Sequence, residues 1–134
     1  MTQNEFRLVC ENKIEKIREN VKSRRIFIWG AGVGGKILEN VCREHEIEVS
    51  GFCDKNADQI KEFLGYLVFP LSEMKPEKDY LIISVMTFEV DVLDWIHEIG
   101  YTCYDCFYIN DNEKFYEYNK FNSDDIVYIG CKVG

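Results

Sequence analysis

The sequence predicts an α/β fold, with one doubly wound, mostly parallel sheet of about five strands and an extra N-terminal helix. Two observations predict it. Apolar runs of strand length alternate with helical patterns along the chain, which is typical of parallel sheets with right-handed crossovers. The run Asp79–Val85 is almost wholly apolar, as in a central strand covered on both faces. A length of 134 residues allows one domain, residues 1–134.

The first elements follow from the spacing of apolar residues. Residues 5–21 place Phe6, Val9, Ile14, Ile17 and Val21 at helical spacing among charges, which predicts an amphipathic helix. A short strand over 25–29 leads through glycines into a helix whose inward face carries Val33, Ile37, Leu38, Val41 and Cys42. A second strand is expected over 47–53, ending before Asp54.

The later elements complete a core over residues 25–107. We expect a loop with a helical turn over 55–64, a short strand over 65–70 and a brief helix at 72–74. After the strand 79–85, Thr87 caps a helix that runs to Ile99 and stops at Gly100, and residues 101–107 form the fifth strand. Residues 108–134 form a C-terminal extension, in which 126–129 is a candidate edge strand.

The segment Gly30–Gly35, called the glycine turn below, is the first candidate site. Gly30, Gly32 and Gly35 fit G-x-G-x-x-G, whose glycines allow a tight turn, a close approach to phosphate and close helix–strand packing. A strand, a glycine turn and a helix in that order present backbone N–H groups and a positive helix end to a phosphate. Ala31, Val33 and Gly34 complete the expected phosphate-binding set.

Asp54 is the candidate ribose ligand. It lies about 20 residues beyond the last glycine, at the end of the second strand, where a carboxylate can accept hydrogen bonds from two ribose hydroxyls. The alternative is a surface turn residue that opens Asp-Lys-Asn. In parallel sheets, ligands lie where the strand order reverses, so the glycine turn is expected to face the end of the strand 79–85. Lys55, Ser84 and Val85 therefore join the expected site, although packing explains Ser84 equally well.

Three rival interpretations apply to these motifs. Gly30–Lys36 also fits the phosphate loop of nucleotide triphosphatases, but Ile37 stands where that loop needs Ser or Thr for magnesium. Tyr116 and Lys120 have the Tyr-x-x-x-Lys spacing of short-chain dehydrogenases, in a chain too short for a substrate pocket. The third is a protein-interaction module with a purely structural glycine turn.

Composition restricts the partners. A net charge of −8 gives no electrostatic reason to bind nucleic acid or anionic membrane. No segment has the pattern of a membrane span or of a signal peptide, and this predicts a cytoplasmic protein. The six cysteines are expected to be buried small hydrophobes, because Cys103 and Cys106 are the only C-x-x-C pair and no second pair completes a zinc site. His45 and His97 stand alone, so no metal is expected.

The motifs together resemble a small Rossmann-like domain found in bacterial sugar O-acyltransferases, nucleotide-sugar dehydratase/epimerase proteins and polysaccharide-biosynthesis proteins. The similarity rests on Gly30–Gly35, Gly51–Asp54, Gly65–Pro70 and Asp79–Ile83. It implies an NAD-like or nucleotide-sugar ligand at the glycine turn, with Asp54 on the ribose, in surface-glycan metabolism. We expect no catalysis by this chain alone, because residues 108–134 are too few to form a second surface that holds a substrate against the ligand. A missing catalytic domain or a neighbour in a homo-oligomer would have to supply that surface.

Overall fold

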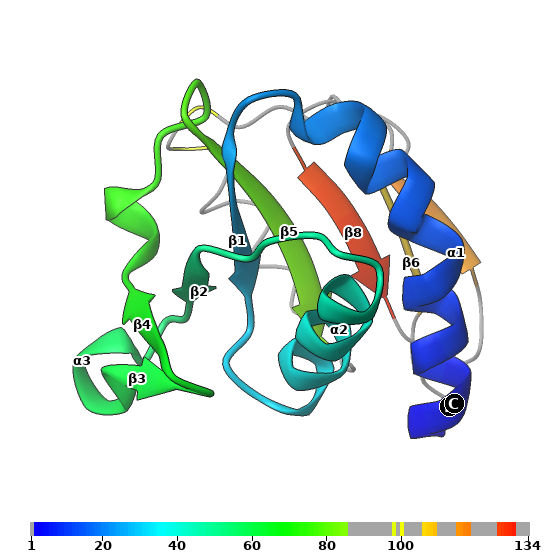
Figure 1. Cartoon of the computed structure of the whole chain (residues 1–134), viewed down its shortest axis with the longest axis horizontal. Helices are drawn as coiled ribbons and strands as arrows, with labels where there is room; N and C mark the ends of the chain where they lie inside the picture. The colour runs from blue at the N-terminus through cyan, green and yellow to red at the C-terminus, as the bar shows by residue number, and fades with distance from the viewer. Residues whose placement is uncertain are drawn as a thin grey trace.

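The computed structural model of the protein describes residues 2–85, 98, 100, 106–109, 115–118 and 126–130. The protein has an α/β fold centred on a six-stranded sheet in the order β3-β4-β2-β1-β5-β8 (Figure 1). The elements are α1 (Gln3–Val21), β1 (Arg25–Trp29), α2 (Val33–Glu44), β2 (Gly51–Cys53), α3 (Ala57–Ile60), β3 (Glu62–Phe63), β4 (Tyr66–Phe69), the 3-10 helix η1 (Leu71–Glu73), β5 (Asp79–Val85), β6 (Cys106–Ile109), β7 (Phe115–Tyr118) and β8 (Ile126–Gly130).

The sheet is mostly parallel, as predicted. Strands β4, β2, β1, β5 and β8 run parallel to their neighbours, and only the two-residue strand β3 is antiparallel, against β4. Strands β6 and β7 form a separate antiparallel pair. From β1 the chain builds β2 and β4 on one side, whereas β5 and β8 lie on the other, so the strand order reverses between β1 and β5.

The central strands are buried on both faces, which is why their sequences are continuously apolar rather than alternating. Ile26 and Ile28 of β1 and Tyr80 and Ile82 of β5 join the core that faces α1 and α2. The intervening residues, among them Phe27 of β1, are also buried. The ring of Phe27 meets that of Phe69 edge-on, with centroids 5.6 Å apart.

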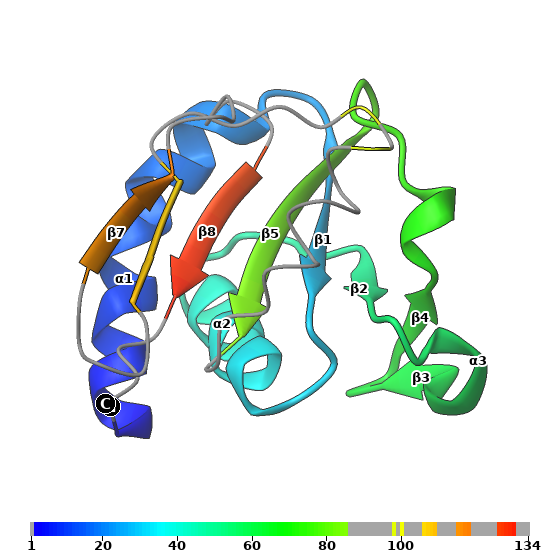
Figure 2. The same ribbon diagram turned by 180° about the vertical axis from the view of Figure 1, so that it is seen from behind.

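Helix α1 begins in a capping box, in which Glu5 N–H donates to Thr2 Oγ1 and Thr2 N–H donates to Glu5 Oε1, each at 3.1 Å. Its buried stripe is Phe6, Cys10, Ile14 and Ile17. Both α1 and α2 lie on the same face of the sheet, as the two opposite views show (Figures 1 and 2). Arg7 of α1 binds Asn40 of α2 at 2.7 Å and also pairs with Glu44.

The fifth parallel strand is not the one expected. Of the predicted strand 101–107, the structure describes only Cys106 and Phe107, and they belong to β6, which pairs with β7. The candidate edge strand takes the fifth place as β8, with Leu81 opposite Ile126 and Val85 opposite Gly130. Strand β8, which lies in the predicted C-terminal extension, is therefore part of the sheet and contacts α1 (Figure 2).

The second strand is shorter than expected. Residues 47–50 precede β2. Ile47 N–H donates to Cys42 O at 2.8 Å, at the C-terminal end of α2, and among these four residues only Ser50 N–H donates to β1, at Ile26 O. The brief helix at 72–74 is the 3-10 helix η1, one residue earlier. The helix expected over 87–99 lies outside the described residues except for Glu98, which is helical, and Gly100 after it has a φ of +101°.

Candidate functional site

The glycine turn leaves the carboxyl end of β1 and enters α2 at Val33, beside the point where the strand order reverses (Figure 1). Gly30 has a φ of +115°, which L side chains rarely adopt. Its N–H donates to Cys53 O at 2.9 Å, so the ladder between β1 and β2 continues into the turn. The tight turn predicted for the first glycine is confirmed.

The other two motif glycines have different surroundings. A Cβ at Gly35 would lie 1.9 Å from Gly30 O and 3.1 Å from the Phe52 ring, so α2 can pack this closely only on a glycine. A Cβ at Gly32 would meet nothing within 4 Å, and the residue is exposed. The predicted packing role of Gly35 is confirmed, whereas Gly32 leaves an open approach to the backbone.

Backbone donors gather at the start of α2. Gly32 is the N-cap and has no side chain to offer, and the first turn holds no acidic residue. The first intrahelical bond is Lys36 N–H to Gly32 O at 2.9 Å, so the N–H groups of Val33, Gly34 and Gly35 precede it. The positive end of the helix dipole therefore points toward the exposed side of the turn. Val33, expected to face inward, is 51% exposed because it occupies the first helical position.

Asp54 lies directly against the glycine turn. Its Oδ2 accepts the N–H of Ala31 and its Oδ1 accepts the N–H of Asn56, each at 2.9 Å. Its own N–H donates to Phe69 O at 3.2 Å, which extends the pairing of β2 with β4. Asp54 therefore contacts the glycine turn, and the Asn56 bond also makes it the turn residue of the alternative interpretation, whereas its role as a ribose ligand stays a prediction.

The remaining predicted residues are placed as follows. Ser84, 1% exposed, donates from Oγ to Gly34 O at 2.8 Å. It therefore contacts the glycine turn as expected, through a buried bond that favours the packing interpretation. Val85 ends β5 opposite Gly130. Lys55 is exposed next to Asp54. Ile37 packs against the core, so no hydroxyl stands at the magnesium position of a triphosphatase loop.

A buried carboxylate on α2 was missed. Glu39 is 4% exposed, one helical turn beyond Gly35, and pairs with Arg43 at 3.1 Å. Burial, the charge of Glu39 and a hydrogen bond to it raise the pKa of Tyr66. The only signal in the sequence was a charge on the inward face of an amphipathic helix, and such residues usually reach solvent.

Three of the cysteines, Cys10, Cys42 and Cys53, are buried, as expected. Burial, and then the charge of Glu39, raises the pKa of Cys42 to about 12, and burial also raises the pKa of Cys53. Neither thiol is therefore a nucleophile at neutral pH. Within the described part of the chain, no three His, Cys, Asp or Glu side chains gather as a metal site, and His45 is the C-cap of α2.

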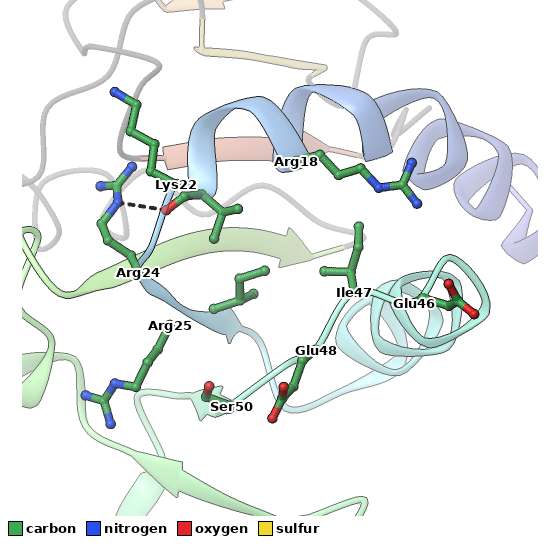
Figure 3. A pocket seen from close by; sticks show the side chains of 10 residues that line it. Arg18, Lys22, Arg24, Arg25, Glu46, Ile47, Glu48 and Ser50 are labelled. Atoms are coloured by element: carbon green, nitrogen blue, oxygen red, sulfur yellow. Dashed lines mark hydrogen bonds between the residues drawn. The ribbon is translucent and has the colours of Figure 1, made fainter.

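A pocket of about 560 Å³ lies at the other end of β1, between the C-terminal ends of α1 and α2 (Figure 3). Three of its basic side chains already have partners: Arg24 donates to Asn20 O at 2.6 Å and to Val21 O at 3.4 Å, Arg18 donates to His45 O at 2.7 Å, and Arg25 pairs with Asp79 at 2.8 Å. Glu46 and Glu48 face the same space. Because these cations already bind carbonyl or carboxylate oxygens and two glutamates line the same space, this pocket is a poor phosphate site.

Two further motifs lie near the C-terminal end. Tyr116 is in strand β7, whereas a dehydrogenase Tyr-x-x-x-Lys pair requires a helix; Lys120 lies outside the described residues. Cys106 is in β6, and Cys103 and His97 also lie outside them. In the part of the chain that the structure describes, no helix has both the length and the hydropathy to cross a bilayer.

Comparison with known proteins identifies the family. The model of the family described as "C2185-like, N-terminal" matches residues 22–107, which is more than half of the chain, so the chain belongs to this family. No curated protein and no solved structure matches the chain significantly. The matched residues begin directly after α1 and end within β6, so the glycine turn and Asp54 lie inside the family region, whereas α1 and β8 lie outside it.

Proposed function

We propose that this member of the C2185-like, N-terminal family is a nucleotide-binding domain, with the glycine turn as its phosphate site and an NAD-like molecule or a nucleotide-sugar as its ligand. The exposed backbone of the turn beside Gly32 carries this proposal. The first N–H groups of α2 lie next to it, with no side-chain cap and no acidic residue in the first turn. A phosphate satisfies such donors and is attracted by the helix dipole.

The place of the turn in the sheet supports the same ligand class. The parallel strands β4-β2-β1-β5-β8, numbered by their order in the chain, read 3-2-1-4-5, the order of Rossmann-like dinucleotide-binding sheets. In open sheets of this kind, ligands bind beyond the carboxyl ends of the strands where the order reverses, between β1 and β5 here. The glycine turn occupies that position.

Asp54 supports a ribose-containing ligand. Each of its carboxylate oxygens accepts one backbone N–H and retains a second lone pair. Two free lone pairs on neighbouring oxygens suit the two vicinal hydroxyls of a ribose. We infer that the ribose binds on the side of Asp54 away from Ala31, with the phosphates over Gly32.

The biological setting is proposed from the family resemblance given by the sequence motifs. We place the chain in the cytoplasm, in sugar or surface-glycan metabolism, as a binding domain without catalysis of its own and without nucleic-acid or membrane partners. Hydride or acyl transfer needs a second surface that holds the substrate against the ligand and excludes water. A catalytic domain or a second copy of the chain would have to supply it.

A protein-interaction module is the second candidate, and two contacts favour it. The conformation of Gly30 and the packing of Gly35 against Gly30 O explain two of the three motif glycines without any ligand. The bond from Ser84 to Gly34 O likewise stabilises the turn by itself. A substitution at Gly32 distinguishes the nucleotide-binding function from the interaction module, because nothing in the surroundings of Gly32 requires a glycine there for folding.

The deciding experiment is thermal unfolding with NAD, UDP-sugars, CoA or ATP. A ligand at a hundredfold excess over its Kd stabilises the fold by about 2.7 kcal/mol. We expect a higher midpoint with NAD or a UDP-sugar, and no such rise in Gly32→Val, which folds because its side chain meets open space but covers the phosphate approach. No shift with any ligand would favour the interaction module, and an equal shift in Gly32→Val would place the site elsewhere.

A further inference from the structure

The Asp54 carboxylate joins two turns that are far apart in the sequence. Oδ2 holds Ala31 N–H in the glycine turn, and Oδ1 holds Asn56 N–H at the start of the turn that leads into α3. Asp54 O also accepts Ala57 N–H at 3.2 Å, so the residue organises the second turn through its backbone as well. The carboxylate is half-buried, and hydrogen bonds to a charged group are stronger than those between neutral groups.

The Ala31 bond sets the direction of the glycine turn. Gly30 N–H is held by Cys53 O, Ala31 N–H is held by Asp54 Oδ2, and α2 starts two residues later. Two consecutive donors of the turn are therefore fixed by the last residue of β2 and the residue that follows it. The bond from Asp54 is the one side-chain contact in this pairing. Without it, the turn could change direction at Gly32, because a Cβ at this exposed position would meet no atom within 4 Å and glycine has little intrinsic conformational preference.

We propose that Asp54 is a positioning residue for the phosphate site: it orients the glycine turn through Ala31, in addition to any contact with a ribose. This inference rests on the proposed nucleotide-binding function, which it deepens. A residue that only bound ribose would affect ribose-containing ligands alone. A residue that orients the turn also determines the affinity for a phosphate ligand that has no ribose, because pre-organised donors lose less entropy on binding.

The test compares NAD with inorganic pyrophosphate, which has no ribose, by isothermal titration calorimetry. The variants are Asp54→Ala, which removes both accepted bonds, and Asp54→Asn, whose single amide oxygen can accept for only one of the two N–H groups. Asp58→Asn is the control, because it removes an equal charge from an exposed position in α3. Circular dichroism establishes that each variant is folded.

We expect pyrophosphate to bind about tenfold more weakly to Asp54→Ala than to the wild type, the effect of losing one charge-assisted bond. NAD is expected to weaken by more than tenfold, because it loses ribose contacts as well. Asp58→Asn is expected to bind both ligands like the wild type. Unchanged pyrophosphate affinity in Asp54→Ala, with weakened NAD, would overturn the positioning role and leave Asp54 as a ribose ligand only.

Amide hydrogen exchange of Ala31, followed by NMR without ligand, tests the tether separately. We expect a protected Ala31 amide in the wild type and Asp58→Asn, and faster exchange in Asp54→Ala while amides in β1 stay protected. An unprotected wild-type Ala31 amide would overturn the tether itself. Failure of NAD and pyrophosphate to bind a wild type with a protected Ala31 would instead overturn the proposed function, and with it the effect on affinity.

Discussion

The hydroxyl of Ser84 donates a 2.8 Å hydrogen bond to the carbonyl of Gly34, which ties the end of β5 to the first turn of α2. Both residues are buried. The bond spans the point where the strand order reverses, so it fixes the helix that carries the candidate phosphate site relative to the second half of the sheet.

Replacing Ser84 by Ala is expected to lower the free energy of unfolding by about 1–3 kcal/mol, because Gly34 O is then buried without its donor. Urea unfolding followed by circular dichroism measures the change. Ser72→Ala is the matched control, since Ser72 is exposed in η1 and its loss is expected to cost less than about 0.5 kcal/mol. Equal stability of the two variants would contradict a structural role for the Ser84 bond.

The glycines at 32 and 35 are expected to respond oppositely to alanine. Gly35→Ala places a methyl group 1.9 Å from Gly30 O, so the strain is expected to exceed the gain of about 1 kcal/mol in helix propensity and to destabilise the fold by roughly 1–3 kcal/mol. Gly32→Ala meets no atom and is expected to cost about 1 kcal/mol or less, as a poorer N-cap. Thermal melts of both variants give the comparison; a wild-type midpoint for Gly35→Ala would show that α2 can move away from β1.

Stability is expected to fall in alkaline solution through the Cys42 thiol. Its pKa is raised from 9.0 to about 12 in the folded chain, by burial first and then by Glu39. Above pH 9 the unfolded chain loses this proton while the folded chain keeps it. The stability that the folded chain gains from keeping the thiol protonated is therefore complete below pH 9 and is lost as the pH rises toward 12.

The measurement is urea unfolding between pH 8 and 11 for the wild type and Cys42→Ala. The wild-type curve is expected to fall more steeply above pH 9, by up to about 1.4 kcal/mol per pH unit. Because Cys42→Ala also leaves a cavity in the core, only the slopes are compared. Parallel slopes would show that the thiol does not titrate differently in the two states.

Replacing Glu46 by Gly is expected to stabilise the fold. Glu46 follows α2 with a φ of +60°, where its N–H bonds to Arg43 O and that of Ile47 to Cys42 O, as at a helix end that usually carries glycine. Glu46→Gly is expected to raise the free energy of unfolding by about 1 kcal/mol. Glu46→Ala removes the same charge but keeps the strain, so a gain of equal size in that variant would assign the effect to charge instead of backbone.

The sequence predicted those features that depend on neighbouring residues. The limits of β1 and β5 followed from unbroken apolar runs. The placement of Asp54 directly after the second strand followed from the end of an apolar run, about 20 residues along the sequence from the last glycine of the motif. The fifth strand was assigned wrongly because residues 101–107 and 126–129 have similar strand patterns. Only pairing with β5, through long-range contacts, selects between them.

Within the candidate site, residue types were predictable but hydrogen-bond partners were not. Nothing in the spacing indicated that Asp54 accepts Ala31 N–H or that Ser84 donates to Gly34 O, because both bonds depend on how β2 and β5 are placed against the turn. Glu39 was missed for a related reason: it is buried and hydrogen-bonded to Tyr66 of β4, a contact between distant residues that no local pattern encodes.

The late position of β8 in the chain has a consequence for biosynthesis. Strand β5 pairs with β1 on one side and with β8 on the other, and α1 contacts β8 as well. As the ribosome extends the chain, the hydrogen-bonding groups on the second side of β5 have no native partner until residues 126–130 emerge. Nascent chains that end earlier present an apolar strand with one open edge, the kind of surface that chaperones cover. Emergence of β8 from the ribosome, more than formation of the glycine turn, therefore determines when this sheet edge is protected from aggregation.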